Sequence, residues 1–164
     1  MVKLQLGEYV SLGKVESELK TCPVVENICV YGDANKAYTV ALVVPNQNYL
    51  EEIASNLGII GKSLEELCSN PQIEKAVLQE LVEQAKKCTF LYIFILFLLL
   101  LIEFIIIQLL AFVGKLQRFE IPGAVKLCAE QWSPDMGLVT AAFKLKRKAV
   151  QERYQHEINR MYAS

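Results

Sequence analysis

A long apolar run, residues 89–113, constrains the fold of this 164-residue chain more than any other feature. As an α-helix, a run of this length would measure roughly 37 Å, which is enough to cross a bilayer with some tilt. Glu103 inside the run would cost about 2 to 3 kcal/mol near mid-membrane, and the surrounding Leu, Ile and Phe residues would outweigh that cost. The run therefore predicts a transmembrane helix, although the flanking basic residues favour neither orientation.

The sequence on both sides of this run is typical of a small folded domain. Alternating and β-branched stretches predict strands over residues 2–6, 25–33, 37–45 and 124–128. Capping residues and apolar spacing predict helices that begin near Ser11, Asn46 and Pro71, and a last helix from about Lys144. Outside the apolar run, this pattern predicts an α+β fold with short sheets flanked by helices.

Few side chains point to chemistry on their own. The five cysteines are widely spaced without a CxxC pair, which favours reduced, buried thiols over a disulfide framework or a zinc site. The one histidine, His156, lies opposite the apolar face of the last predicted helix, as a solvated residue would. The stretch GIIGKS at residues 58–63 lacks the first Gly and the preceding strand of a phosphate-binding loop. These residues predict no metal site.

Five motifs occur in order on the two sides of the apolar run. They are VKLQLGEYVSLGKVESEL, NICVYG, VVPNQ, FEIP and GLVTAAFKLKRK. Together they resemble the C-terminal domain of long-chain fatty-acid CoA ligases, members of the adenylate-forming, AMP-binding enzyme superfamily. The resemblance implies a small mobile α+β lid on a larger N-terminal domain. Such enzymes use ATP to convert a fatty acid to an acyl-adenylate, and then pass the acyl group to coenzyme A.

The resemblance also implies roles for individual residues, one set for each orientation of the lid. In the adenylating orientation it assigns to Lys144 the cation that offsets the repulsion between the fatty-acid carboxylate and the α-phosphate. In the thioester-forming orientation, Gly7 permits close approach to the pantetheine arm of coenzyme A, with Glu8 and Tyr9 beside it in the same loop. The alternative interpretation of Tyr9 is an ordinary turn residue without a ligand contact. The alternative interpretation of Lys144 and its basic neighbours is a solvated helix start.

The expected cofactors, again by resemblance, are ATP, coenzyme A and Mg²⁺, with most of their site on the N-terminal domain. The expected partners are a long-chain fatty acid, coenzyme A and a membrane, and no nucleic acid is expected to bind. The expected location is the cytosolic face of the endoplasmic reticulum or of the mitochondrial outer membrane. The sequence lacks the hinge Asp that precedes VKLQ in the family and any Gly/Ser/Thr-rich ATP loop, so the chain alone is expected to be inactive. Ala141 also stands where the family more often has an acidic residue.

Three interpretations of the apolar run follow. A spanning helix would place Gly7 and Lys144 on opposite sides of the membrane and split one small core. A re-entrant hairpin would keep the two halves together, with arms too short to cross a bilayer. Retained non-coding sequence is the third, because removing residues 89–114 leaves EQAKKCKLQRFEIP with the family's spacing. We therefore divide the chain into a first part of the lid (residues 1–88), an apolar insert (residues 89–114) and the remainder of the lid (residues 115–164). The alternative to a function in a ligase is a small membrane-anchored, non-catalytic module derived from the lid.

Overall fold

Helices flank a small sheet in the computed structural model of the chain, which describes residues 1–99 and 116–163. In chain order the elements are β1 (Val2–Lys3), β2 (Tyr9–Val10), α1 (Leu12–Leu19), β3 (Val25–Tyr31), β4 (Val40–Pro45), α2 (Gln47–Asn56), α3 (Leu64–Cys68), α4 (Pro71–Leu99), β5 (Ala124–Leu127), α6 (Arg147–Arg153) and α7 (Gln155–Met161). Both strands and helices occur on each side of the apolar run, so the predicted α+β class is confirmed.

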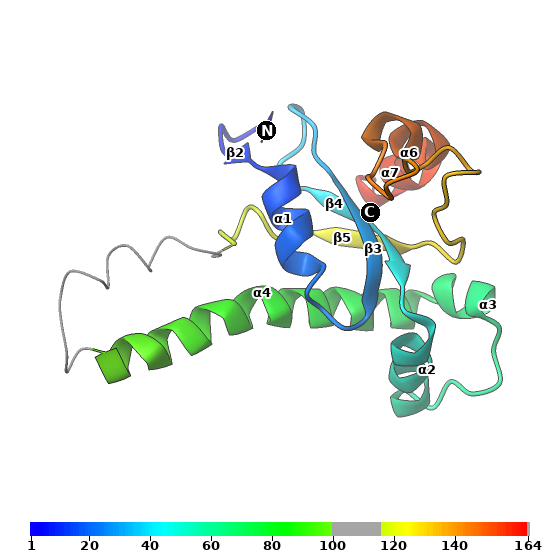
Figure 1. The fold of residues 1–164 in the computed structure, drawn as a ribbon, viewed down its shortest axis with the longest axis horizontal. Helices are drawn as coiled ribbons and strands as arrows, with labels where there is room; N and C mark the ends of the chain where they lie inside the picture. The colour runs from blue at the N-terminus through cyan, green and yellow to red at the C-terminus, as the bar shows by residue number, and fades with distance from the viewer. Residues whose placement is uncertain (100–115, 164) are drawn as a thin grey trace.

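A three-stranded sheet in the order β3–β4–β5 forms the centre of the fold (Figure 1). β3 and β4 are antiparallel, whereas β5 joins β4 in parallel after a connection that includes α4. A parallel pair needs such a crossover, because the chain must return to the same end of the sheet. Every residue of β4 is buried, which is typical of a central strand with both faces covered.

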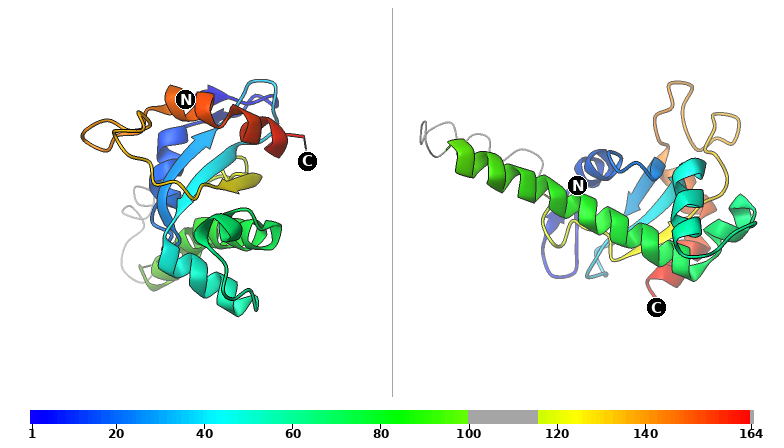
Figure 2. Two further views of the ribbon diagram at one scale, coloured as in Figure 1. Left: turned by 90° about the vertical axis from the view of Figure 1, so that its right-hand side faces the viewer. Right: turned by 90° about the horizontal axis from the view of Figure 1, so that it is seen from below.

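The two faces of the sheet have separate hydrophobic cores. On one face, Ala41 and Val43 of β4 pack with side chains from α1, α2, α3 and α4. On the other face, Val40 and Leu42 pack with Trp132 and side chains from α6 and α7. The views in Figures 1 and 2 show α4 and α7 on opposite sides of the sheet. The sequence after the apolar run therefore supplies one edge strand and the whole second helical layer of a single fold.

Local signals begin three helices. The Asn46 side chain accepts hydrogen bonds from the backbone N–H groups of Asn48 and Tyr49 and so caps α2, as predicted. Pro71 is the first residue of α4, also as predicted. Ser63 and Glu66 form a reciprocal capping box for α3, so the end of the GIIGKS stretch is a helix start.

The strand predicted over residues 2–6 is shorter than expected. It ends at Lys3, and the chain then turns through Gly7, whose φ is 98°, before β2 pairs with β1 in a separate two-stranded sheet. Alternation alone does not reveal such a turn, because a Gly can reverse the chain within an alternating pattern.

The last helix also begins later than predicted, at Arg147 and not near Lys144. Leu145 forms an antiparallel β-bridge with Val139, which holds the residues before Arg147 in an extended hairpin. The helix is then divided at Tyr154 into α6 and α7. Pairing within this hairpin has thus overridden the helical preference of the basic stretch.

The transmembrane helix expected over residues 89–113 is the main correction. Among residues 1–99 and 116–163, no helix is long and apolar enough to cross a membrane. The first turns of α4 are amphipathic and bury Ile73, Val77, Leu81 and Ala85 in the core, so they belong to the folded domain. Only the part of α4 after Cys88 is apolar throughout, roughly 16 Å or half the hydrocarbon thickness. The remainder of the expected span lies outside the described residues.

Candidate functional site

Lys144 lies in a short hairpin that connects the sheet to α6. The backbone N–H of Thr140 donates to the Lys144 carbonyl at 2.8 Å, and the N–H of Lys146 donates to the Leu138 carbonyl at 2.9 Å. The Lys144 N–H donates in turn to the Thr140 hydroxyl at 3.1 Å. The Lys144 side chain is exposed, and no ion pair within the described part of the chain involves its ammonium group. The hairpin thus presents a cation outward on a backbone that is held in place.

Phe143 at the tip of this hairpin is a residue that sequence reasoning missed. Its φ is 54°, in the left-handed region that bulky side chains rarely adopt, and its side chain is 70% exposed. Both features cost free energy in an isolated domain, and strained residues of this kind gather at functional sites. A large apolar side chain directly before a predicted catalytic Lys is the sequence signal that could have identified Phe143.

Gly7 and Glu8 lie in the turn that joins β1 to β2, and Tyr9 follows as the first residue of β2. The N–H of Leu4 donates to the Glu8 carbonyl at 2.8 Å, and the N–H of Gly7 donates to the Leu4 carbonyl at 3.0 Å. The Tyr9 ring is 62% exposed, with the Lys3 ammonium 5.7 Å from its centroid. One carboxylate oxygen of Glu8 is buried without a hydrogen-bond partner in the part of the chain that the structure describes. A Cβ built on Gly7 would meet nothing within 4 Å, so its Cα is open to an approaching ligand.

The structure does not bring this turn next to Lys144. Leu4 and Val10, which flank the β1–β2 turn, pack in the core on one face of the sheet, whereas Leu138 and Val139 of the Lys144 hairpin pack in the core on the other face. The two predicted sets of site residues therefore occupy different faces of one domain. That arrangement agrees with a domain that presents a different face in each of two orientations.

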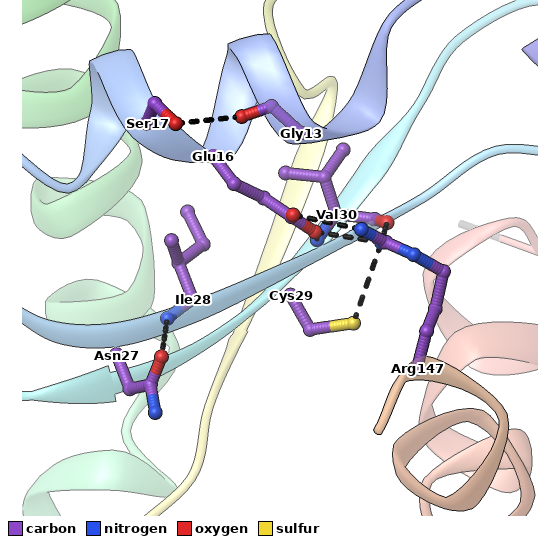
Figure 3. A network of polar contacts seen from close by, with 8 residues as sticks. All are labelled: Gly13, Glu16, Ser17, Asn27, Ile28, Cys29, Val30 and Arg147. Atoms are coloured by element: carbon purple, nitrogen blue, oxygen red, sulfur yellow. Dashed lines mark hydrogen bonds and ion pairs between the residues drawn. The ribbon is translucent and has the colours of Figure 1, made fainter. Parts of the chain in front are cut away.

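An ion pair lies between these faces and connects the segments that carry them (Figure 3). Glu16 is on α1, which follows the β1–β2 turn, and Arg147 is the first residue of α6. The guanidinium donates to both carboxylate oxygens of Glu16, at 2.6 and 2.8 Å, and to the carbonyl of Val30 at 2.7 Å. The hydrogen bonds from Arg147 to Glu16 raise the pKa of the guanidinium. No local sequence pattern predicts this contact, because its partners are 131 residues apart.

Comparison with known proteins shows which family this domain resembles in sequence. The profile of the AMP-binding enzyme C-terminal domain matches residues 14–87, from α1 through the first part of α4. This chain carries an AMP-binding enzyme C-terminal domain. The predicted resemblance is therefore confirmed.

Relatives match the AMP-binding C-terminal domain on both sides of the apolar run. Long chain acyl-CoA synthetase 8 of Arabidopsis thaliana is 37% identical over 163 residues, which cover 99% of this chain and 19% of that protein. Long-chain-fatty-acid–CoA ligase 4 of Saccharomyces cerevisiae is 32% identical over 164 residues, 99% of this chain and 20% of its own length. The chain thus spans about a fifth of the length of these relatives.

Solved structures share the fold of the AMP-binding C-terminal domain. The adenylation domain of a carboxylate reductase from Mycobacterium chelonae superposes with a TM-score of 0.69 at 24% identity, over 99% of this chain and 19% of that chain. An adenylation and carrier-protein didomain from Segniliparus rugosus, solved in complex with AMP, gives a TM-score of 0.68 over 98% of this chain and 17% of its own.

The predicted burial of the cysteines is confirmed for Cys22, Cys29, Cys68 and Cys128 in the AMP-binding C-terminal domain, and the thiols of Cys29, Cys68 and Cys128 are free, as predicted. The side chain of Cys88 lies outside the described residues. Burial raises the pKa of the Cys29 and Cys128 thiols to about 12 and that of Cys68 to about 11. His156 is exposed, also as predicted.

We expect the stability of the domain to fall as the pH rises from 9 toward 11. Unfolded thiols ionise near pH 9, whereas the Cys29 and Cys128 thiols in the folded state hold their protons to about pH 12. Over this window the folded state binds more protons than the unfolded state, so the free energy of unfolding decreases as the pH rises. Below pH 9 the thiols are protonated in both states and do not change the free energy of unfolding with pH. Urea unfolding at a series of pH values measures the slope. Cys128→Ala should flatten it, and an unchanged slope in that variant would contradict this account.

A second prediction concerns the turn at Gly7. Gly7→Ala should destabilise the domain by about 1 kcal/mol, because alanine is disfavoured at a φ of 98° while no atom obstructs its Cβ. Gly13→Ala is the matched control, since Gly13 lies within α1 with equally open surroundings, and alanine there should stabilise by about 0.5 to 1 kcal/mol. Thermal unfolding measures both shifts, and the same sign for the two substitutions would show that the turn conformation is not as described.

Proposed function

We propose that this chain acts as the lid of a long-chain fatty-acid CoA ligase, which activates a long-chain fatty acid with ATP and transfers it to coenzyme A. One observation carries the proposal: an exposed lysine, Lys144, projects from an ordered hairpin of an AMP-binding enzyme C-terminal domain whose relatives are long-chain acyl-CoA synthetases. In this proposal the nucleotide and fatty-acid sites lie on a larger N-terminal domain.

Lys144 would act in the first half-reaction. Attack of a carboxylate on the α-phosphate brings two anions together, and an ammonium group between them offsets their repulsion and the charge that develops in the transition state. Lysine suits this position, because it is a compact point charge on a flexible stem that can follow the reacting oxygens. Mg²⁺, when bound with ATP, would neutralise the leaving pyrophosphate.

The β1–β2 turn would act in the second half-reaction. With no Cβ at Gly7 and an exposed backbone, the turn accommodates the narrow pantetheine arm of coenzyme A beside the exposed Tyr9 ring. The two sets of residues occupy different faces, so a rotation of the domain between half-reactions would exchange one set for the other at the N-terminal site.

A chimera tests this function. Residues 1–164 would replace the matching fifth of Arabidopsis thaliana long chain acyl-CoA synthetase 8, and formation of acyl-CoA from palmitate, ATP and coenzyme A would be measured. We expect activity well above that of the same synthetase with its C-terminal domain removed. A folded chimera as inactive as that truncated control would exclude the proposed function. The isolated chain, assayed in parallel, is expected to form no acyl-CoA.

A further inference from the structure

The ion pair between Arg147 and Glu16 also includes the backbone of Val30 on β3. Arg147 donates to both carboxylate oxygens of Glu16 and to the Val30 carbonyl, while Glu16 also accepts from the Val30 N–H at 2.8 Å (Figure 3). The Glu16 side chain is 15% exposed and that of Arg147 38% exposed. A two-pronged contact of this kind fixes the orientation of the guanidinium as well as its distance from the carboxylate.

Helix stability does not explain a cation at this position. Arg147 is the first residue of α6, where the helix dipole disfavours positive charge, and the preceding residue provides no side-chain cap. The side chain of neighbouring Lys148 is 90% exposed, and its ammonium pairs with Glu152 of the same helix at a distance of 3.9 Å. Arg147 is therefore the member of the basic stretch that contacts the body of the domain.

The position of Arg147 in the chain connects this contact to Lys144. Only Leu145 and Lys146 lie between them, and Leu145 is bridged to Val139. Buried apolar side chains, Leu138, Val139 and Val150, attach both ends of the hairpin to the second core. Apolar packing is non-directional, so these contacts hold the hairpin on the sheet without fixing the direction in which Lys144 points. The hydrogen bonds of Arg147 to β3 and α1 supply that direction.

We propose that Arg147, through its contacts with Glu16 and Val30, is a positioning residue that sets the direction of Lys144 for adenylate formation. This inference rests on the proposed function of the chain. Because Glu16 is on α1, directly after the β1–β2 turn, the same contact also makes the Lys144 hairpin and that turn move as one rigid body when the domain rotates.

Arg147→Met in the active chimera is the main test. It keeps most of the side-chain length while removing every donor, and we expect the rate of acyl-adenylate formation to fall about 10- to 100-fold through misplacement of Lys144. The rate of thioester formation from added acyl-adenylate should stay within about twofold, since that step uses the other face. Arg147→Lys, which keeps the charge but not the two-pronged geometry, should give an intermediate rate. Arg153→Met is the matched control, because it breaks a pair with Glu130 whose side chains are 47% and 52% exposed.

A double-mutant cycle separates positioning from general support of the fold. If Arg147 acts through Lys144, adding Arg147→Met to Lys144→Ala should cause no further loss of adenylate formation. Equal losses in the two half-reactions, additive losses in the double variant, or no loss at all would overturn the inference. If Arg147→Met lowers the urea midpoint too far for assay, Glu16→Gln provides the second variant, since its amide oxygen still accepts from Val30. An inactive parent chimera would instead count against the proposed function.

Discussion

Replacing Lys144 by alanine is expected to lower the rate of acyl-adenylate formation by about 10²- to 10³-fold in the chimera, the range found when one preorganised charge-stabilising group is removed from an active site. The expectation follows from the exposed ammonium on an ordered hairpin, which has no carboxylate partner in the described part of the chain to weaken it. Release of pyrophosphate in a single turnover measures this step directly.

Two comparisons make the result specific to Lys144. Lys148→Ala removes a cation four residues away whose side chain is 90% exposed, and it should change the rate by less than about twofold. Thioester formation from added acyl-adenylate should persist in Lys144→Ala, because in the proposed function the β1–β2 turn, and not the Lys144 hairpin, faces the reaction in that step. Equal adenylation rates with and without the Lys144 ammonium would remove the role proposed for it.

Leu81→Ala is expected to destabilise the domain by about 2 to 5 kcal/mol. This is a large part of the free energy of unfolding of a small domain, which is roughly 5 to 15 kcal/mol. Leu81 is fully buried near the middle of the amphipathic part of α4, where it packs with the first core of the sheet. The loss combines reduced apolar burial with the cavity that the smaller side chain leaves behind.

Urea unfolding, followed by far-ultraviolet circular dichroism, measures this loss. Leu57→Ala is the control, because Leu57 is 47% exposed at the end of α2 and should cost less than about 1 kcal/mol. Similar losses for the two substitutions would mean that α4 does not pack against the sheet as described.

Elements with strong local signals could be predicted from the sequence. β3 and β4 were predicted from β-branched stretches, and the starts of α2 and α4 from Asn46 and Pro71. In each case the decisive feature is local: Asn46 caps its own helix, Pro71 suits the first helical position, and β3 and β4 are consecutive strands that pair with each other. The site residues Lys144 and Gly7 came from the family resemblance, and the structure supplies their surroundings.

The remaining features depend on contacts that a local pattern does not contain. The basic stretch after Lys144 predicts a helix start, but a bridge from Leu145 to Val139 makes it a hairpin. The half-buried state of Arg147 depends on Glu16, far away in the sequence. The left-handed conformation of Phe143 arises from the same hairpin. For the apolar run, hydropathy alone predicted a separate spanning helix. It does not show that the described start of the run continues α4, a helix whose first turns are packed in the core of the domain.

The residues before and after the apolar run belong to one folded domain. Ala85 and Leu116 are buried in the same core, and Figure 1 shows the last turns of α4 extending away from the sheet. We propose that residues 89–114 are extraneous to this fold. The most direct measurement is acyl-CoA formation by a chimera whose C-terminal part lacks these residues, with Cys88 joined to Lys115. We expect activity at least equal to that of the chimera with the complete chain, whereas loss of activity together with loss of the folded state would mean that residues 89–114 are required by the fold.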